Sequence, residues 1–404
     1  MSLDGPLSIV LAGSGGMGAV YLRALLDRRH EDVYRLAGVV DPYPERCPHL
    51  DELRTGGIPV FPEMADFYRR RSANLAIVSS PIHVHCAQTC LALENGSHVL
   101  CEKPVAATVG EARRMTEARD KAQRWVAVGY QWSFSQAVQN LKKDIGRGLF
   151  GRPKRLRCLY LWPRDDAYYA RNDWAGKKRY PGGGWVLDGP ANNAMAHDLH
   201  NMFYVLGAET DESAKPVEVE AELYRAFSIE NYDTAAARGR TDTGVELRFY
   251  VSHASKRDLG PVLRYEFETG EVFAAGRGAD IQAKRADGTV LNYGSPDLEP
   301  MKKLWDAVDA AKTGRPPVCG IESALSQTVF VNGMQSAMPL IAEFPRSLIR
   351  REEEAGRGRL WVEGLDDVLE RGFETGELPS ETGVSWGHPG TVVDLRRPPD
   401  VPGI

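Results

Sequence analysis

The 404-residue sequence contains no apolar run long enough to cross a bilayer and no excess of positive charge. A spanning helix needs about 20 apolar residues, so the sequence predicts no membrane segment. The formal net charge of −5 gives no electrostatic reason to expect a nucleic acid or an anionic membrane as a partner. The first residues also lack the basic-then-apolar pattern of a secretory signal, and we therefore expect a cytoplasmic protein.

A disulfide framework is also missing. The six cysteines follow no regular spacing, which is typical of free thiols in a reducing compartment. Cys86 and Cys90 are one helical turn apart and lie near His83 and His85, so a metal site is one interpretation of this stretch. Small side chains buried on a helix are far commoner in such a pattern, and we expect no bound metal.

The composition that is present, 43% hydrophobic and 26% charged residues, is that of a soluble globular protein with room for two or three domains. In the first third, short apolar runs alternate with helical patterns. The runs that we expect to form strands are 9–12, 36–40, 75–80, 98–101 and 126–128. This alternation predicts an N-terminal α/β Rossmann domain over residues 1–130, with a doubly wound parallel sheet.

A glycine-rich turn follows the first of these strands. Three glycines have the spacing G-x-G-x-x-G, and a helical pattern comes next. This context indicates a dinucleotide-binding turn, in which N–H groups at a helix N-terminus face phosphates. Asp41 ends the second strand at about the distance expected for the acid that binds the adenosine ribose. The cofactor-binding residues expected here are Gly13, Ser14, Gly15, Gly16, Met17, Gly18 and Asp41.

Further polar residues come directly after the later strands. In a parallel sheet, ligands bind at the carboxyl ends of the strands. We therefore expect one cofactor site that also includes Ser79, Ser80, Pro81, Glu102 and Lys103.

Lys103 is the sharpest candidate for catalysis. It follows a buried strand, is held by Pro104, and would lie beside a bound nicotinamide. The positive charge of oxidised nicotinamide and partial burial would both lower the lysine pKa toward a value useful for proton transfer, and Glu102 would orient the side chain. The alternative is an ordinary surface lysine at a strand end.

After about residue 130, apolar and polar residues alternate, as in 245–249 and 263–267. This predicts a C-terminal α+β domain over residues 131–345 with an open, mainly antiparallel sheet, including a hairpin turn at Asp287-Gly288. The charged face of this sheet would be solvated or would meet another subunit. Residues 346–404 are expected to form an extension packed on the domains, with the charge run 350–354 in a solvated helix face or loop.

A second cluster of polar residues follows the glycine loop 182–184. It contains Asp188 and Asn193, and then His197 and His200 one helical turn apart. Such a set suits the binding of hydroxyl groups and the relay of a proton. A metal site of the two histidines with Asp188 is the alternative, and one histidine could instead cap a helix or pack in the core.

Aromatic and polar residues are interleaved between these two clusters. The candidates for substrate binding are Tyr168, Arg171, Asn172 and Trp174, together with Lys103, Asn193, His197 and His200. Aromatic rings stack on the apolar faces of sugars, and polar groups bind neighbouring hydroxyls. A polar loop with buried aromatic residues is an equally good interpretation.

Three motifs occur in order: the glycine turn, Glu102-Lys103-Pro104, and the glycine loop with Asp188 and His197. Together they resemble the glucose-fructose oxidoreductase / inositol dehydrogenase / rhizopine catabolism (Gfo/Idh/MocA) family over about residues 5–340. Pro81-x-x-x-His85 and Gly129-Tyr130-Gln131 look like the family's turn after the third strand and its entry to the second domain. The resemblance therefore adds His85 and Gln131 to the cofactor-binding residues.

The resemblance implies NAD(P)-dependent oxidation or reduction of a sugar, polyol or sugar derivative, with Lys103 as the catalytic lysine. It also implies a homodimer or homotetramer formed through the second sheet. Asn192 stands where the family commonly has a histidine four residues after the aspartate. An alignment from Gly207 backwards instead places His197 at the family histidine, and we favour it.

We therefore expect a dehydrogenase with Lys103, Asp188, His197 and His200 as catalytic residues. Asp41 favours NAD over NADP, because its carboxylate would repel a 2′-phosphate. Two alternatives stay open: a redox-neutral NAD-dependent glycosidase or lyase on the same scaffold, and a non-catalytic NAD(H) sensor.

Overall fold

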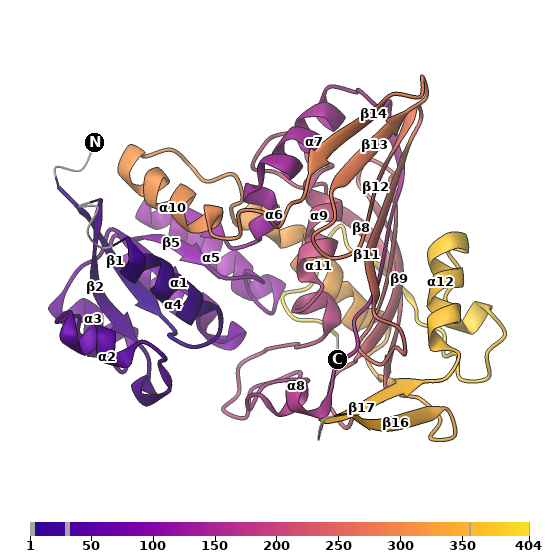
Figure 1. Cartoon of the computed structure of the whole chain (residues 1–404), viewed down its shortest axis with the longest axis horizontal. Coiled ribbons are helices and arrows are strands. Elements are labelled where there is room, and N and C mark those ends of the chain that lie inside the picture. Colours follow the sequence, from indigo (N-terminus) through magenta and orange to yellow (C-terminus); the bar gives the residue numbers. More distant parts are fainter. Residues whose placement is uncertain (1–4, 29–32, 355–356, 404) are drawn as a thin grey trace.

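The computed structural model describes residues 5–28, 33–354 and 357–403, which build two large sheets and a C-terminal segment (Figure 1). The first sheet is parallel, with the strand order β3-β2-β1-β4-β5-β6. Its strands are β1 (Leu7–Ala12), β2 (Tyr34–Val40), β3 (Val60–Phe61), β4 (Leu75–Val78), β5 (His98–Cys101) and β6 (Val126–Val128). This confirms the predicted Rossmann sheet and adds β3, a two-residue edge strand that is too short to leave a pattern in the sequence.

Helices connect these strands and cover the sheet. They are α1 (Met17–Asp27), α2 (Leu50–Thr55), α3 (Met64–Arg70), α4 (Ile82–Glu94) and α5 (Val109–Ala122). Helix α5 begins at a capping box, in which the Thr108 side chain accepts a hydrogen bond from the Glu111 N–H and the Glu111 carboxylate accepts one from the Thr108 N–H. Because every strand runs in the same direction, their carboxyl ends meet at one edge of the sheet.

The second sheet has the strand order β14-β13-β12-β11-β7-β10-β9-β8-β15. Its strands are β7 (Pro153–Leu161), β8 (Pro216–Arg225), β9 (Thr234–Thr241), β10 (Glu246–Ser252), β11 (Leu259–Phe267), β12 (Gly270–Ala275), β13 (Ile281–Arg285), β14 (Val290–Gly294) and β15 (Ala342–Glu343), with β18 (Val392–Asp394) beside β8. Only the pairs β7–β10 and β8–β15 are parallel, so the mainly antiparallel sheet is confirmed. The predicted hairpin turn at Asp287-Gly288 joins β13 to β14.

Helices α7 (Gln136–Gly146), α9 (Ala196–Tyr204) and α11 (Ile321–Ala337) pack on the face of this sheet that is turned toward the Rossmann domain (Figure 1). The short helix α6 (Gln131–Phe134) packs on α7 and α9. Alternate strand residues such as Leu247, Phe249 and Val251 fill the core beneath them. None of the helices in the described ranges is long and apolar enough to span a membrane.

Helix α10 (Lys302–Thr313) returns from the second sheet to the first. Its residues Leu304, Ala307 and Val308 belong to the same apolar core as β1 and β5. This return places Lys303, which lies about 200 positions after β5 in the sequence, beside the end of that strand.

The C-terminal segment contains the hairpin of β16 (Ile349–Glu354) and β17 (Arg357–Val362), followed by α12 (Leu365–Thr375). The prediction of a solvated helix face or loop for the charge run 350–354 was therefore wrong. The run pairs with β17, with Ile349 opposite Val362, and its charges form ion pairs such as Arg350 with Glu363. Cross-strand pairing supplies the order here, and it leaves no local periodicity in the charged strand.

Helix α12 lies on the side of the second sheet that faces away from the Rossmann domain (Figure 1). Helix α12 packs over β7 and β10, and Arg157 and Arg248 on those strands are only 6% exposed. The Arg157 guanidinium donates to the Glu374 carboxylate at 2.6 Å, and Arg248 donates to the Glu374 carbonyl at 2.8 Å. The strand face expected to be solvated or to meet another subunit is thus covered, over these strands, by the chain itself.

Candidate active site

The glycine turn lies between β1 and α1 at the carboxyl edge of the first sheet. Gly13 has a positive φ of 84°, and a Cβ there would lie 2.6 Å from the Ser79 carbonyl oxygen. A Cβ on Gly18 would lie 2.0 Å from the Gly13 oxygen, whereas one on Gly15 would meet no atom within 4 Å. The outer glycines therefore allow tight packing, and the middle one leaves open space, which fits a turn that lets a pyrophosphate approach the backbone.

Asp41 lies beside this turn. Its carboxylate accepts hydrogen bonds from the Ser14 N–H at 2.8 Å and the Tyr43 N–H at 2.9 Å. The acid that ends β2 is thus held at the rim of the glycine turn, as required for a contact with an adenosine ribose.

The other predicted cofactor residues have varied surroundings. Ser79 lies against the glycine turn, while the Ser80 hydroxyl donates to Gln88 at 2.6 Å, and Pro81 directly precedes α4.

His85 is buried with its ring nitrogens 2.9 Å from the carbonyl oxygens of Pro104 and Ser80, so it links the segments that follow β4 and β5. The Gln131 amide donates to Asp297 at 3.2 Å.

Lys103 follows β5 and is half-buried. Its Nζ donates to the backbone oxygen of Asn193 at 2.8 Å and to the Asn193 side-chain oxygen at 3.1 Å. Burial lowers the pKa of Lys103 to about 8, although the nearby Glu102 acts in the opposite direction. A lysine with this pKa is partly neutral near physiological pH and can accept a proton.

Asp188 completes the same network from the second domain. It is 2% exposed, and its carboxylate accepts from the Asn193 amide at 2.8 Å, from the Gly176 N–H at 2.7 Å and from Arg171 at 3.4 Å. Burial raises the pKa of Asp188, and Arg171 partly offsets this. The fold therefore joins Lys103, Asn193, Asp188 and Arg171, four predicted site residues, in one polar network.

Glu102 does not hold the Lys103 amine. Its buried carboxylate accepts from the Tyr21 hydroxyl at 2.6 Å, from the Lys103 backbone N–H at 3.1 Å, and from the Lys303 ammonium. Burial alone would raise the pKa of Glu102, but Lys303 and Tyr21 together lower it. Sequence reasoning missed Tyr21 and Lys303. A hydroxyl within an apolar helix pattern was the only signal for Tyr21, and no local signal marks Lys303.

The two histidines of α9 have different surroundings. Burial lowers the pKa of His197 well below its usual value, and Lys103 and Lys303 lower it further, so this ring lies within the field of the two lysines. His200 is 1% exposed, stacks on Tyr130 with the centroids 3.9 Å apart, and has its Nε2 2.9 Å from the Ser133 hydroxyl. The structure thus holds His200 inside the core, whereas His197 is only partly buried and is influenced by the charge of Lys103.

The predicted substrate loop is ordered by its own contacts. The Arg171 guanidinium lies 3.8 Å from the ring centroid of Tyr168. The Asn172 side chain accepts from the N–H groups of Trp174 and Ala175, so it stabilises a local turn. Trp174 packs against an apolar cluster that contains Ile82, Ala107 and Val186.

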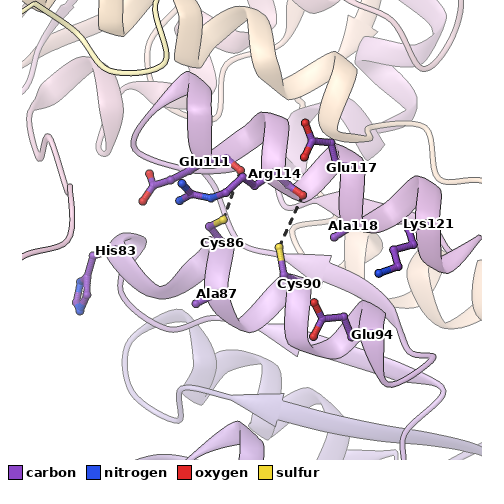
Figure 2. A pocket seen from close by; sticks show the side chains of 10 residues that line it. All are labelled: His83, Cys86, Ala87, Cys90, Glu94, Glu111, Arg114, Glu117, Ala118 and Lys121. Carbon is purple, nitrogen blue, oxygen red and sulfur yellow. Dashed lines mark hydrogen bonds between the residues drawn. The ribbon is translucent and has the colours of Figure 1, made fainter.

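The cysteine-containing stretch lies apart from this network, in a surface groove of about 500 Å³ between α4 and α5. Figure 2 shows Cys86 and Cys90 facing α5 while His83 points away from them; the His83 ring stacks on Tyr180 at 4.0 Å. In the part of the chain that is described, no three side chains of His, Cys, Asp or Glu are arranged to hold a metal ion.

Comparison with known proteins identifies the two halves of this architecture. The oxidoreductase family with an NAD-binding Rossmann fold matches residues 7–130, and the GFO/IDH/MocA C-terminal domain matches residues 138–271. The chain belongs to the GFO/IDH/MocA oxidoreductase family. This confirms the resemblance found in the sequence, and the NAD-binding Rossmann fold confirms the predicted type of cofactor.

Individual GFO/IDH/MocA members are moderately similar to this chain. The rhizopine catabolism protein MocA of Rhizobium meliloti is 26% identical over 199 residues, which are 49% of this chain and 57% of that protein. An inositol 2-dehydrogenase of Rubrobacter xylanophilus is 28% identical over 311 residues, 74% of this chain and 77% of that protein. The match to the first two curated relatives spans about half of their length, 57% and 44%.

Among solved structures, the WlbA dehydrogenase from Bordetella pertussis in complex with NADH and UDP-GlcNAcA superposes with a TM-score of 0.66. The sequence identity is 21%, and the superposition covers 82% of this chain and 97% of that one. At this identity the likeness establishes the shared GFO/IDH/MocA fold.

Proposed function

We propose that this protein is an NAD-dependent dehydrogenase that transfers a hydride between the cofactor and a sugar, polyol or sugar derivative. The observation that carries the proposal is the Lys103 amine, whose pKa burial lowers to about 8 and which lies at the carboxyl end of β5 in an NAD-binding Rossmann fold. The relatives named inositol 2-dehydrogenase and D-glucoside 3-dehydrogenase act in the same chemical class. Since none of these names indicates redox-neutral cleavage or sensing, we propose no second function.

In this mechanism, Lys103 removes the hydroxyl proton from the substrate carbon that is oxidised. Asn193 accepts both hydrogen bonds of the resting Lys103 amine and so fixes its position, which is a main contribution because hydride transfer requires close contact between the reacting atoms. Asp188 holds the Asn193 amide, and His197, whose lowered pKa keeps its ring neutral, binds a neighbouring hydroxyl of the substrate. The glycine turn and Asp41 would hold NAD, which supplies the hydride acceptor when it is bound.

The preference for NAD over NADP is part of the proposal. The Asp41 carboxylate at the end of β2 would repel a 2′-phosphate. Arg46 is the cation that lies near this acid in sequence, and its guanidinium stacks 4.6 Å from the Tyr43 ring.

The proposal also includes a cytoplasmic location, which the six free cysteines support. Any homo-oligomer formed through the second sheet would use the strands that α12 does not cover.

The direct experiment follows reduced nicotinamide by its near-ultraviolet absorbance while the protein and NAD are mixed with sugars, polyols, sugar acids and glycosides. A steady rise with one stereochemical group supports the dehydrogenase. Tight NAD binding, a cleaved glycoside and no rise would instead indicate the redox-neutral enzyme, and binding without any turnover would indicate a sensor. A parallel titration with NADP tests the cofactor preference, which tighter binding of NADP would contradict.

A further inference from the structure

Beyond the Lys103 network, three arginines alternate with aromatic rings. The Arg171 guanidinium lies 3.8 Å from the Tyr168 ring centroid, and Arg164 lies 4.4 Å from the same centroid. Arg164 also lies 3.7 Å from the Trp162 ring, which Arg277 approaches at 5.1 Å. We call these five residues the arginine–aromatic row. It begins at Arg171, which contacts Asp188 and through it the network of Lys103.

The three arginines of the arginine–aromatic row differ in whether a carboxylate pairs with them. Arg171 pairs with Asp188 at 3.4 Å, and Arg277 pairs with Asp258. For Arg164, none of the carboxylates in residues 5–28, 33–354 and 357–403 lies within ion-pair distance. Its neighbours are the rings of Trp162 and Tyr168, the neutral Tyr168 hydroxyl and the second cation Arg171.

This surrounding is unfavourable for a cation that has no anionic partner. Burial lowers the pKa of Arg164, and the charge of Arg171 lowers it further. The Arg164 Nε is also buried without a hydrogen-bond acceptor, which costs free energy in the folded protein. An anion bound at this guanidinium would offset both effects.

We propose that the carbohydrate substrate carries an anionic group, a carboxylate or a phosphate, that binds Arg164. This inference rests on the proposed dehydrogenase function and assigns Arg164 as the residue that selects acidic over neutral substrates. Two aromatic rings hold the guanidinium in place, so little conformational entropy is lost on binding. Its planar N–H groups match the geometry of carboxylate and phosphate oxygens.

The aromatic residues of the arginine–aromatic row contact cations. Guanidinium groups stack on the rings of Tyr168 and Trp162, and Trp162 also stacks on Tyr160 with the ring centroids 5.2 Å apart. These rings therefore orient cations, and recognition at this end of the site depends on charge more than on stacking against a sugar face.

The test compares matched substrates in the wild type and in Arg164→Met, which keeps an apolar stem between the rings and removes the charge. The substrates are methyl glucoside, methyl glucuronide and glucose 6-phosphate, and both initial rates with NAD and titration calorimetry are recorded. We expect the wild type to prefer one acidic member. Arg164→Met should then raise its KM and Kd at least tenfold and change those of the neutral member less than twofold. Arg164→Lys should restore part of the affinity, because it keeps the charge without the planar fork.

Arg152→Met is the matched control, because it makes the same change in net charge. Arg152 pairs with Glu268 beside the start of β7, at the opposite end of that strand from Trp162. A wild type that binds the neutral member best, or an equal loss for neutral and acidic members in Arg164→Met, would overturn the proposal. Selective binding of an acid without NADH formation would support Arg164 as the anion site and contradict the dehydrogenase function. The carboxylate and phosphate members show which anion is bound.

Discussion

At the scale of single residues, the site depends on how burial and hydrogen bonding balance at Lys103. Removing an ammonium group from water disfavours its charged form, and the acceptors that the Lys103 amine contacts are the two neutral oxygens of Asn193. The closest carboxylate in sequence, Glu102, is already engaged by Tyr21 and Lys303. Lys103 thus lacks a direct anionic partner, and its pKa is lowered to about 8.

The pH dependence of turnover follows from this pKa. Only the neutral amine accepts a proton, so kcat/KM for substrate oxidation should rise with pH and level off above about 8. In the direction of reduction, which needs the ammonium form, activity should instead fall above that pH. Lys103→Met should lower kcat about 10²- to 10⁴-fold while NADH affinity, measured by fluorescence titration, stays within a factor of a few. Normal turnover in this variant would contradict the assignment of Lys103.

At the scale of elements, helix α9 contains two histidines, His197 and His200, with different roles. His197 lies within the field of Lys103 and Lys303. His200 is enclosed by Tyr130 and Tyr204, and burial lowers its pKa to about 3. We infer that the first histidine serves the reaction and the second stabilises the packing of α9 on α6.

Matched substitutions on this helix separate the two duties. His197→Asn should lower kcat by about tenfold or more and leave the unfolding midpoint nearly unchanged. His200→Asn should lower the free energy of unfolding by about 1–3 kcal/mol, because it disturbs a buried hydrogen bond, while kcat per folded molecule is kept. Urea denaturation and steady-state kinetics on both variants measure this contrast, and a reversed pattern would exchange the two assignments.

At the scale of the whole molecule, the C-terminal segment changes what the second sheet can do. Leu369 and Phe373 of α12 belong to an apolar cluster with Leu159 and Tyr250 of the strands beneath. The segment also reaches the first domain, where Arg113 of α5 pairs with Asp400. The sheet is therefore packed on both faces by one chain over β7 and β10.

The contribution of this packing can be measured at Leu369, which is fully buried, with Leu340, 87% exposed, as a control. Leu369→Ala should lower the free energy of unfolding by about 2–5 kcal/mol, whereas Leu340→Ala should change it by about 0.5 kcal/mol or less. Urea denaturation gives both values. Equal, small effects would show that α12 contributes little to the stability of the fold.

Local patterns predicted much of the fold. The Rossmann strands and the alternation in the second sheet each depend on neighbours in the sequence, and the structure confirms them. The charged strand 350–354 was missed because its order comes from pairing with β17. Lys303 was missed for the same kind of reason, since it takes its role from a contact with Glu102, about 200 positions away.

The sequence by itself determined the glycine turn, the Glu102-Lys103-Pro104 motif and the family to which they belong, because such motifs act within one strand, turn or helix. Only the tertiary structure decided that Glu102 binds Lys303 and not the Lys103 amine, that His200 packs in the core against Tyr130, and that α12 covers the outer face of the sheet. These outcomes depend on contacts between side chains of elements that are far apart in the chain. The burial and charge compensation at such contacts arise only in the folded molecule.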